Sequence, residues 1–169
     1  MLICLDTETT GLRAGYDEVL QLTIIDGNEN VLMNEYFKPD RIKSWPDAQR
    51  VNHISPWNVK DRPSIQAFKC RIEEILSCAD LIVGYNVGFD LSMLRGVGIA
   101  VPETPVYDVM KEFAPIYGEW NDYYGDYKWQ KLERCAAYYH YKWEGGAMHD
   151  SLGDTKATLY CYRRMTEDK

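Results

Sequence analysis

The apolar run at residues 2–5 constrains the fold of this chain more than any other feature. Leu-Ile-Cys-Leu is followed at once by Asp6-Thr7-Glu8. A strand buried on both faces appears as a continuous apolar run, whereas a strand with one solvated face alternates apolar and polar residues. We therefore expect residues 2–6 to form the central strand of a sheet, with acidic side chains at its end.

The following segments supply the rest of a sheet and its helical layers. Residues 18–26 and 31–37 flank Gly27-Asn28-Glu29-Asn30, which predicts an antiparallel hairpin. Later strands are expected at 81–85 and near 106–107. Helices are expected at about 63–78, 86–97, 108–118, 129–141 and 150–167. Asn86 and Asp108 are the expected N-caps of two of them. This order predicts a mixed α/β sheet flanked by helices.

Length and hydropathy favour one globular domain over residues 1–169. A chain of 169 residues can bury one substantial core, and 46% of its residues are hydrophobic. No apolar run approaches the roughly 20 residues that span a bilayer. The N-terminus lacks the basic start and apolar stretch of a signal peptide. We expect a cytoplasmic protein without a membrane partner.

Charge and cysteine content narrow the classes of function. The net charge of −7 argues against a protein that coats nucleic acid through many Lys and Arg contacts. It is compatible with an enzyme that grips one strand end through bound cations. The five cysteines are scattered and form no C-x-x-C pair, which favours free buried thiols over disulfides or a zinc site.

Acidic side chains follow both buried strands. Residues i and i+2 of a strand share a face, so Asp6 and Glu8 should point the same way. Two carboxylates so close repel each other unless a cation or a shared proton intervenes. Asp90 falls in the first turn of the helix after the strand at 81–85, where ligand sites of α/β sheets gather. A solvated strand end or a helix-dipole contact would explain each acid taken alone.

A histidine precedes the last acid of interest. Of the three histidines, His149 stands five residues before Asp154, near the start of the last expected helix. Within one helix the two side chains would point about 140° apart. Both can face one site only if His149 precedes the helix and Asp154 lies inside it.

The conjunction of Asp6, Glu8, Asp90, His149 and Asp154 is far more specific than any one of them. Together with Asp-Thr-Glu-Thr-Thr-Gly-Leu at 6–12, N-x3-F-D ending at Asp90, and His-x4-Asp-x3-Thr at 149–158, it resembles the DEDDh exonucleases of the DnaQ-like superfamily. The superfamily includes polymerase proofreading subunits and exonuclease-X-like enzymes. The resemblance implies a ribonuclease-H-like mixed five-stranded sheet of order 3-2-1-4-5, flanked by helices.

The resemblance also implies a metal-dependent 3′→5′ exonuclease that releases 5′-nucleoside monophosphates. Four carboxylates without a Cys/His cluster favour Mg²⁺ or Mn²⁺ over zinc, and two such ions per site are expected. Asp6 would bridge them, Glu8 and Asp154 would complete one site, and Asp90 would bind the second ion mainly through water. His149 would be the general base.

Further residues are expected to bind substrate, with Leu12 as an apolar wedge beside the terminal base. They are Thr7, Thr9, Thr10, Gly11, Leu12, Asn52, His53, Asn86 and Phe89. The family often has His-x-Ile-Thr where this chain has Asn52-His53-Ile54-Ser55. Whether this chain keeps the phosphate contacts that the family makes there is an open question. The aromatic-rich loop at 117–129 could stack on bases or be pinned to the core.

Three functions stay open from the sequence. Single-stranded DNA is favoured as substrate, with an enzyme that acts alone or as the proofreading partner of a DNA polymerase. An exoribonuclease that trims RNA ends would use the same site. A non-catalytic exonuclease fold that binds proteins would be expected to lack an acid or the histidine, and all five are present.

Overall fold

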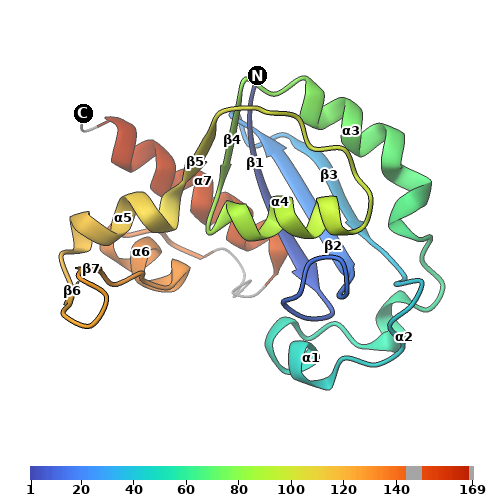
Figure 1. The fold of residues 1–169 in the computed structure, drawn as a ribbon. Helices are drawn as coiled ribbons and strands as arrows, with labels where there is room; N and C mark the ends of the chain where they lie inside the picture. The colour runs from blue at the N-terminus through green and yellow to red at the C-terminus, as the bar shows by residue number, and fades with distance from the viewer. Residues whose placement is uncertain (144–149, 168–169) are drawn as a thin grey trace.

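A five-stranded mixed sheet organises the computed structural model, which describes residues 1–143 and 150–167. Its order is β3-β2-β1-β4-β5, so the 3-2-1-4-5 prediction is confirmed. β1 is central, antiparallel to β2 and parallel to β4 (Figure 1). The strands are β1 (Leu2–Thr9), β2 (Val19–Asp26), β3 (Val31–Tyr36), β4 (Leu81–Gly84) and β5 (Val106–Asp108).

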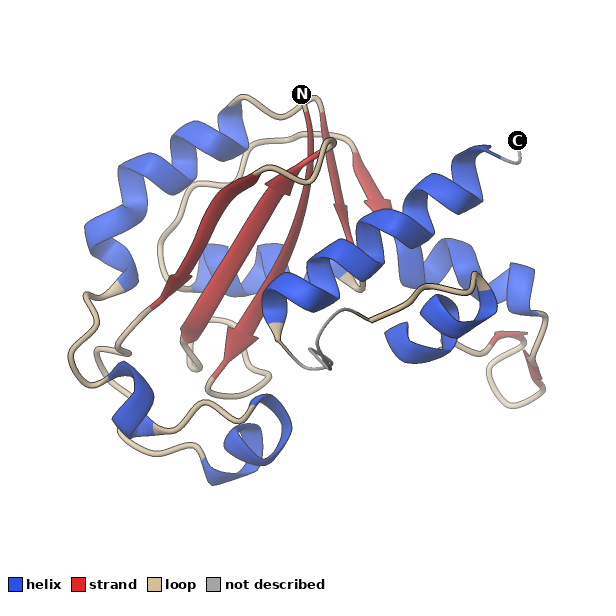
Figure 2. Cartoon of the chain, turned by 180° about the vertical axis from the view of Figure 1, so that it is seen from behind, coloured by secondary structure: helices blue, strands red, loops and turns tan. Residues whose placement is uncertain are grey.

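Helices cover both faces of this sheet (Figures 1 and 2). One face packs on α3 (Lys69–Ser77) and α4 (Val87–Gly96), and the other on α5 (Val109–Tyr117), α6 (Leu132–Tyr138) and α7 (Ser151–Glu167). The short helices α1 (Pro46–Asn52) and α2 (Pro56–Val59) lie in the connection after β3. No helix among the described residues is long and apolar enough to cross a bilayer.

The alternation of side chains along β1 determines where the acids point. Ile3 and Leu5 enter the core formed with α3 and α4, and Cys4 enters the core formed with α5, α6 and α7. All three are at most 1% exposed, so burial of this strand on both faces is confirmed. Asp6 and Glu8 continue the Cys4 side of the strand and therefore face α7.

Three local predictions need correction. The helix expected at about 63–78 begins as a 3₁₀ turn at Ile65–Phe68, a common form of helix start, before α3. The helix expected at about 129–141 is shorter and consists of α6 alone. Gln130, before it, instead bonds through its side chain to Glu119 at the base of a hairpin. That hairpin, β6 (Trp120–Asn121) and β7 (Asp126–Tyr127), occupies the segment expected to be a loop.

The cysteines are free thiols, as expected, but they are not all buried. Cys4, Cys135 and Cys161 are buried, whereas Cys70 and Cys78 are exposed. Neither exposed thiol belongs to the buried clusters that cover the sheet.

A close backbone contact at the end of α4 gives a stability prediction. A Cβ added to Gly96 would lie 2.4 Å from the main-chain nitrogen of Gly15. The backbone must move to relieve such a clash, so Gly96→Ala should lower the free energy of unfolding by about 1–3 kcal/mol. Gly88→Ala in the same helix is the matched control, because its Cβ would meet no atom within 4 Å. Chemical denaturation measures both, and equal stability of the two variants would contradict the prediction.

Candidate active site

β1 extends beyond β4, and Asp90 takes the place of the missing neighbour. The parallel pairing runs from Leu2 opposite Leu81 to Cys4 opposite Val83, and β4 ends at Gly84. Past this point Asp90 Oδ1, from the first turn of α4, accepts hydrogen bonds from the main-chain N–H of Thr7 (3.0 Å) and from its hydroxyl (2.6 Å). Asp90 is only 3% exposed, so a buried carboxyl is fixed against the end of β1.

The first turn of α7 lies against the other side of β1. The Ser151 hydroxyl donates to the main-chain oxygen of Asp6 at 3.4 Å, and Asp154 belongs to this same turn. Asp150 stands just before the helix, and its carbonyl accepts from the N–H of Asp154 at 2.9 Å. α7 thus begins at Ser151 and includes Asp154, as the motif requires. His149 lies outside the described residues.

The acids brought together here raise one another's pKa values. Burial, followed by the charges of Asp6, Asp154 and Asp90, raises the pKa of Glu8 to about 9. Burial, followed by the Asp150 charge, raises the pKa of Asp6 to about 6, although the Ser151 hydroxyl opposes this. Burial and the charge of Asp6 raise the pKa of Asp90 well above its usual range. The four predicted carboxylates therefore form one interacting cluster.

The cluster has the chemistry of a hard-cation site. Asp6 Oδ2 is buried and has no hydrogen-bond partner among the described residues. All the clustered donors are carboxylate oxygens, which suit Mg²⁺ or Mn²⁺. Over residues 1–143 and 150–167, no three acidic, histidine or cysteine side chains already converge on one metal position.

Two residues near the cluster were not among the predicted site residues. The charges of Asp150 and Glu8 raise the pKa of Tyr36, after the effect of burial. Tyr36 lies opposite Gln21 in β2, which lies opposite Glu8 in β1. Cross-strand partners share a face, so the hairpin register could have indicated Tyr36.

The small residues after β1 shape a loop that leaves Leu12 in solvent. The Thr9 hydroxyl donates to the Gly11 carbonyl at 2.6 Å, and Thr10 hydrogen-bonds Asp17. A Cβ on Gly11 would lie 2.6 Å from the Asp17 carboxyl, so a larger residue there would have to displace that side chain. Leu12 is 82% exposed, as a side chain free to contact a ligand must be.

Asn52, rather than His53, reaches the end of β1. Asn52 is 7% exposed, and its side-chain NH₂ donates to the Thr9 carbonyl at 3.0 Å. His53 ends α1 in the left-handed region at φ 59°, with an exposed side chain.

The remaining predicted substrate residues lie at the start of α4. Asn86 is the N-cap residue of α4, as expected, but at φ 62° its side chain makes no capping hydrogen bond. Its main-chain N–H instead donates to Asp108 Oδ1 at 2.9 Å. Asp108 does cap α5, through the N–H of Met110. Phe89 is half-buried against the core.

The sheet order and the carboxylate cluster define a ribonuclease-H-like α/β fold of the exonuclease type. The signature of the exonuclease family (RNase_T) matches residues 3–162, and the chain belongs to this family. The resemblance to DnaQ-like exonucleases is thereby confirmed.

Individual relatives agree with this assignment. The chain is 38% identical over 97 residues to exodeoxyribonuclease 10 of Escherichia coli K12, covering 56% of this chain and 40% of that protein. It is 24% identical over 169 residues to the PolC-type DNA polymerase III of Staphylococcus saprophyticus, covering 96% of this chain and 11% of that protein. It thus spans less than half the length of either relative.

The fold also matches a solved nuclease structure. E. coli exonuclease I in complex with a dT13 oligonucleotide has a TM-score of 0.75 against this chain at 22% identity. The match covers 98% of this chain and 40% of that one. It shows a common fold.

The raised pKa of Glu8 predicts a pH-dependent stability. Between its ordinary value of 4.5 and about 9, the folded protein retains a proton that the unfolded chain releases. Stability must therefore fall as the pH rises through this interval. The glutamine side chain of Glu8→Gln does not titrate in this range. The free energy of unfolding of Glu8→Gln should therefore exceed that of the metal-free wild type by an amount that grows with pH.

Chemical denaturation in EDTA, at pH values from about 5 to 9, measures this gain. The exposed Glu103→Gln is the matched control, for which no such growth is expected. A difference between Glu8→Gln and wild type that stays constant with pH would refute the prediction.

Proposed function

We propose that this chain is a metal-dependent 3′→5′ exonuclease that hydrolyses DNA from its 3′ end, preferring single strands and releasing 5′-nucleoside monophosphates. The observation that carries this proposal is the partly buried carboxylate cluster at the end of β1. Asp90 approaches it from α4 and Asp154 from α7. Such a cluster is costly unless cations occupy it, because its members repel each other.

Two Mg²⁺ or Mn²⁺ ions fit the donor set. Asp6 would bridge them, Glu8 and Asp154 would complete one site, and Asp90 would contribute mainly through water. The unpartnered Asp6 Oδ2 supports the bridging role, and the engagement of Asp90 Oδ1 by Thr7 supports an indirect one. When bound, such ions activate water and stabilise the charge of the departing oxygen.

The chain's own residues would supply proton transfer and orientation. His149 would take the proton from the attacking water, a role suited to a pKa near neutrality. The main chain around Gly11 and the side chains of Thr7 and Asn86 would position the terminal nucleotide. Leu12 would lie against its base. These roles rest on the sequence motif and on the placement of the described residues.

DNA is preferred as substrate because the names of two similar proteins describe action on DNA or a complex with a DNA oligonucleotide. One is an exodeoxyribonuclease, and the other is an exonuclease in complex with dT13. Similarity to a PolC-type polymerase favours a polymerase partner. Degradation of 3′-labelled single-stranded DNA and of a matched oligoribonucleotide tests the preference. Faster hydrolysis of the RNA would instead assign an exoribonuclease.

Removal of Asp6 or of the metal should abolish turnover. Asp6→Ala deletes the central carboxylate, and it should leave metal-free stability unchanged or raised because like-charge repulsion is relieved. Release of mononucleotides from labelled DNA measures turnover, with and without EDTA. Asp80→Ala, an exposed acid at the opposite end of the sheet, is the matched control. Near-wild-type activity of Asp6→Ala would show that the site is misassigned.

Replacement of His149 should slow turnover without preventing binding. Loss of a general base typically lowers the rate by a factor of about 10²–10⁴. Turnover of His149→Ala should therefore fall by that factor, and its pH–rate profile should lose the acid limb. His140→Asn is the control, since His140 is exposed and its φ of 61° suits Asn. Unchanged turnover and pH dependence in His149→Ala would remove histidine from the mechanism.

A further inference from the structure

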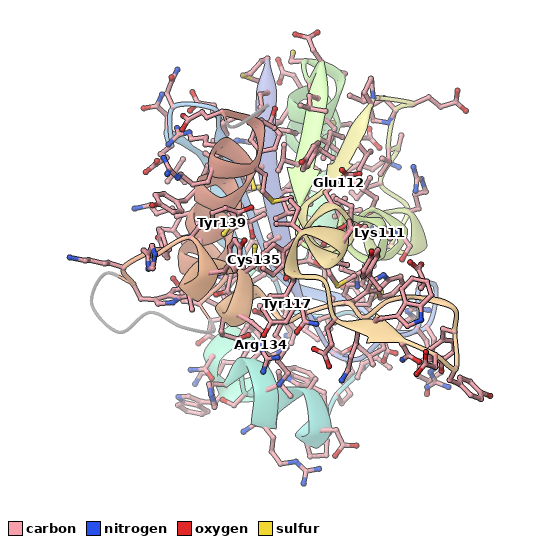
Figure 3. The ribbon with its side chains drawn as sticks, turned by 90° about the vertical axis from the view of Figure 1, so that its left-hand side faces the viewer. Lys111, Glu112, Tyr117, Arg134, Cys135 and Tyr139 are labelled. Atoms are coloured by element: carbon pink, nitrogen blue, oxygen red, sulfur yellow. The ribbon has the colours of Figure 1, made fainter. Side chains whose placement is uncertain are left out.

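The hairpin formed by β6 and β7 exposes aromatic rings that the core does not use. Trp120 is 53% exposed, Tyr123 87%, Tyr124 76% and Trp129 57%. The hairpin projects away from α5 and α6 beside the sheet (Figures 1 and 3). Most rings of the loop are therefore not pinned to the core, although Tyr117 at its start packs against Phe113. A cluster of exposed rings on one element marks an interaction surface.

Polar contacts at its base, not its rings, hold this hairpin in place. The Glu119 carbonyl accepts from the N–H of Lys128 at 2.7 Å. The Glu119 carboxylate accepts from Lys128 Nζ and from Gln130 Nε2, both at 2.9 Å. A two-stranded hairpin by itself is marginally stable in water, so these contacts matter. The rings are consequently free to serve another purpose.

The tip of the hairpin is equally well ordered. Asn121 Oδ1 accepts from the N–H groups of Tyr123 and Tyr124, and Gly125 turns the chain at φ 64°. Trp120 and Tyr127 are cross-strand partners whose rings meet edge-on at 5.2 Å. Pre-ordered aromatic rings bind a ligand with little loss of conformational entropy.

Cationic side chains accompany these rings at the base of the hairpin. Tyr124, Tyr127 and Trp129 line a hollow of about 630 Å³ together with Lys128. Trp129 and Lys128 also border a second hollow, of about 650 Å³, that includes Lys131 and Arg134. Lys111 on α5 lies 5.9 Å from the Trp129 ring (Figure 3). Acids stand among these cations, since Asp126 lines the same hollow as Lys128, and Glu119 pairs with Lys128 at 2.9 Å.

The base of the hairpin is tied to the strand that leads into the active site. The Tyr85 hydroxyl, directly after β4, donates to the Gln130 carbonyl at 2.8 Å. Lys111 also pairs with Asp108 at 3.5 Å, and Asp108 accepts from the N–H of Asn86 at the start of α4. The hairpin base thus adjoins the helix that carries Asp90.

We propose that this hairpin binds the single strand upstream of its 3′ end, by stacking bases on Tyr124 and Trp129 and holding phosphates at Lys111 and Lys128. This rests on the proposed exonuclease function. Stacking accepts any base, and Lys–phosphate contacts supply affinity independent of sequence. The exposed rings of Tyr124 and Trp129 offer faces on which bases stack, which favours a nucleic-acid strand as the occupant.

The test compares kcat/KM for short and long oligodeoxythymidylates, of about 4 and 16 nucleotides. The long strand supplies many nucleotides upstream of its 3′ end for the hairpin to bind, and the short strand supplies few. Loss of one stacking ring should lower the long-to-short ratio about 5- to 150-fold in Trp129→Ala and in Tyr124→Ala. Trp129→Phe keeps a stacking face and should retain most of the ratio. Val31→Ala, an exposed apolar residue at the start of β3, is the control.

Wild-type ratios in both alanine variants would overturn the hairpin proposal and leave a protein-binding surface as the alternative. Fluorescence anisotropy of the labelled long strand measures its binding to the Asp6→Ala protein independently of hydrolysis. This measurement separates the hairpin proposal from the proposed function. If the wild type hydrolyses neither strand, yet Trp129→Ala weakens binding in the Asp6→Ala background, the function fails and the hairpin proposal stands. If Trp129→Ala leaves that binding unchanged, the hairpin proposal fails even where hydrolysis is robust.

Discussion

The difference in length between β1 and β4 determines where this protein can place its acids. β1 has eight residues and β4 has four, so the second half of β1 has no strand neighbour on that side. A buried main-chain N–H must still find an acceptor. Asp90 provides it for Thr7, and this draws a carboxyl from α4 toward the Asp6 and Glu8 carboxyls. The same hydrogen bond that completes the sheet edge therefore assembles the site.

Packing elsewhere must offset the repulsion that this assembly creates. The sheet carries buried apolar clusters on both faces, and β1 contributes to each of them. Burial of apolar surface stabilises the fold by about 25 cal/mol per Å². That stabilisation lets the end of β1 keep carboxyls whose pKa values burial and mutual charge both raise. A local conflict inside an otherwise consistent fold is typical of functional sites.

The sequence predicted the sheet and the acid cluster well, because both follow from short-range patterns. An apolar run at residues 2–5 required a central strand, and the motif spacing placed Asp90 and Asp154 at helix starts. The left-handed conformation of Asn86 and the 119–130 hairpin were not predicted. Asn86 takes a left-handed conformation in which its main-chain N–H bonds to Asp108, 22 residues away. The hairpin depends on pairs between Glu119 and residues that follow its turn. Such distant contacts leave no periodic signature.

Hydrogen-bond satisfaction distinguishes the structural acid Glu18 from Asp6 of the site. Glu18, 6% exposed, accepts main-chain hydrogen bonds from Asp40, Arg41 and Ile42. Its burial is thereby compensated, and it fixes the chain after β3. Asp6 Oδ2 is also buried, yet no described residue donates to it. An unpaired buried carboxylate oxygen is costly unless a ligand satisfies it. Both residues are acids at strand ends in the sequence, and only the folded chain shows which of them still needs a cation.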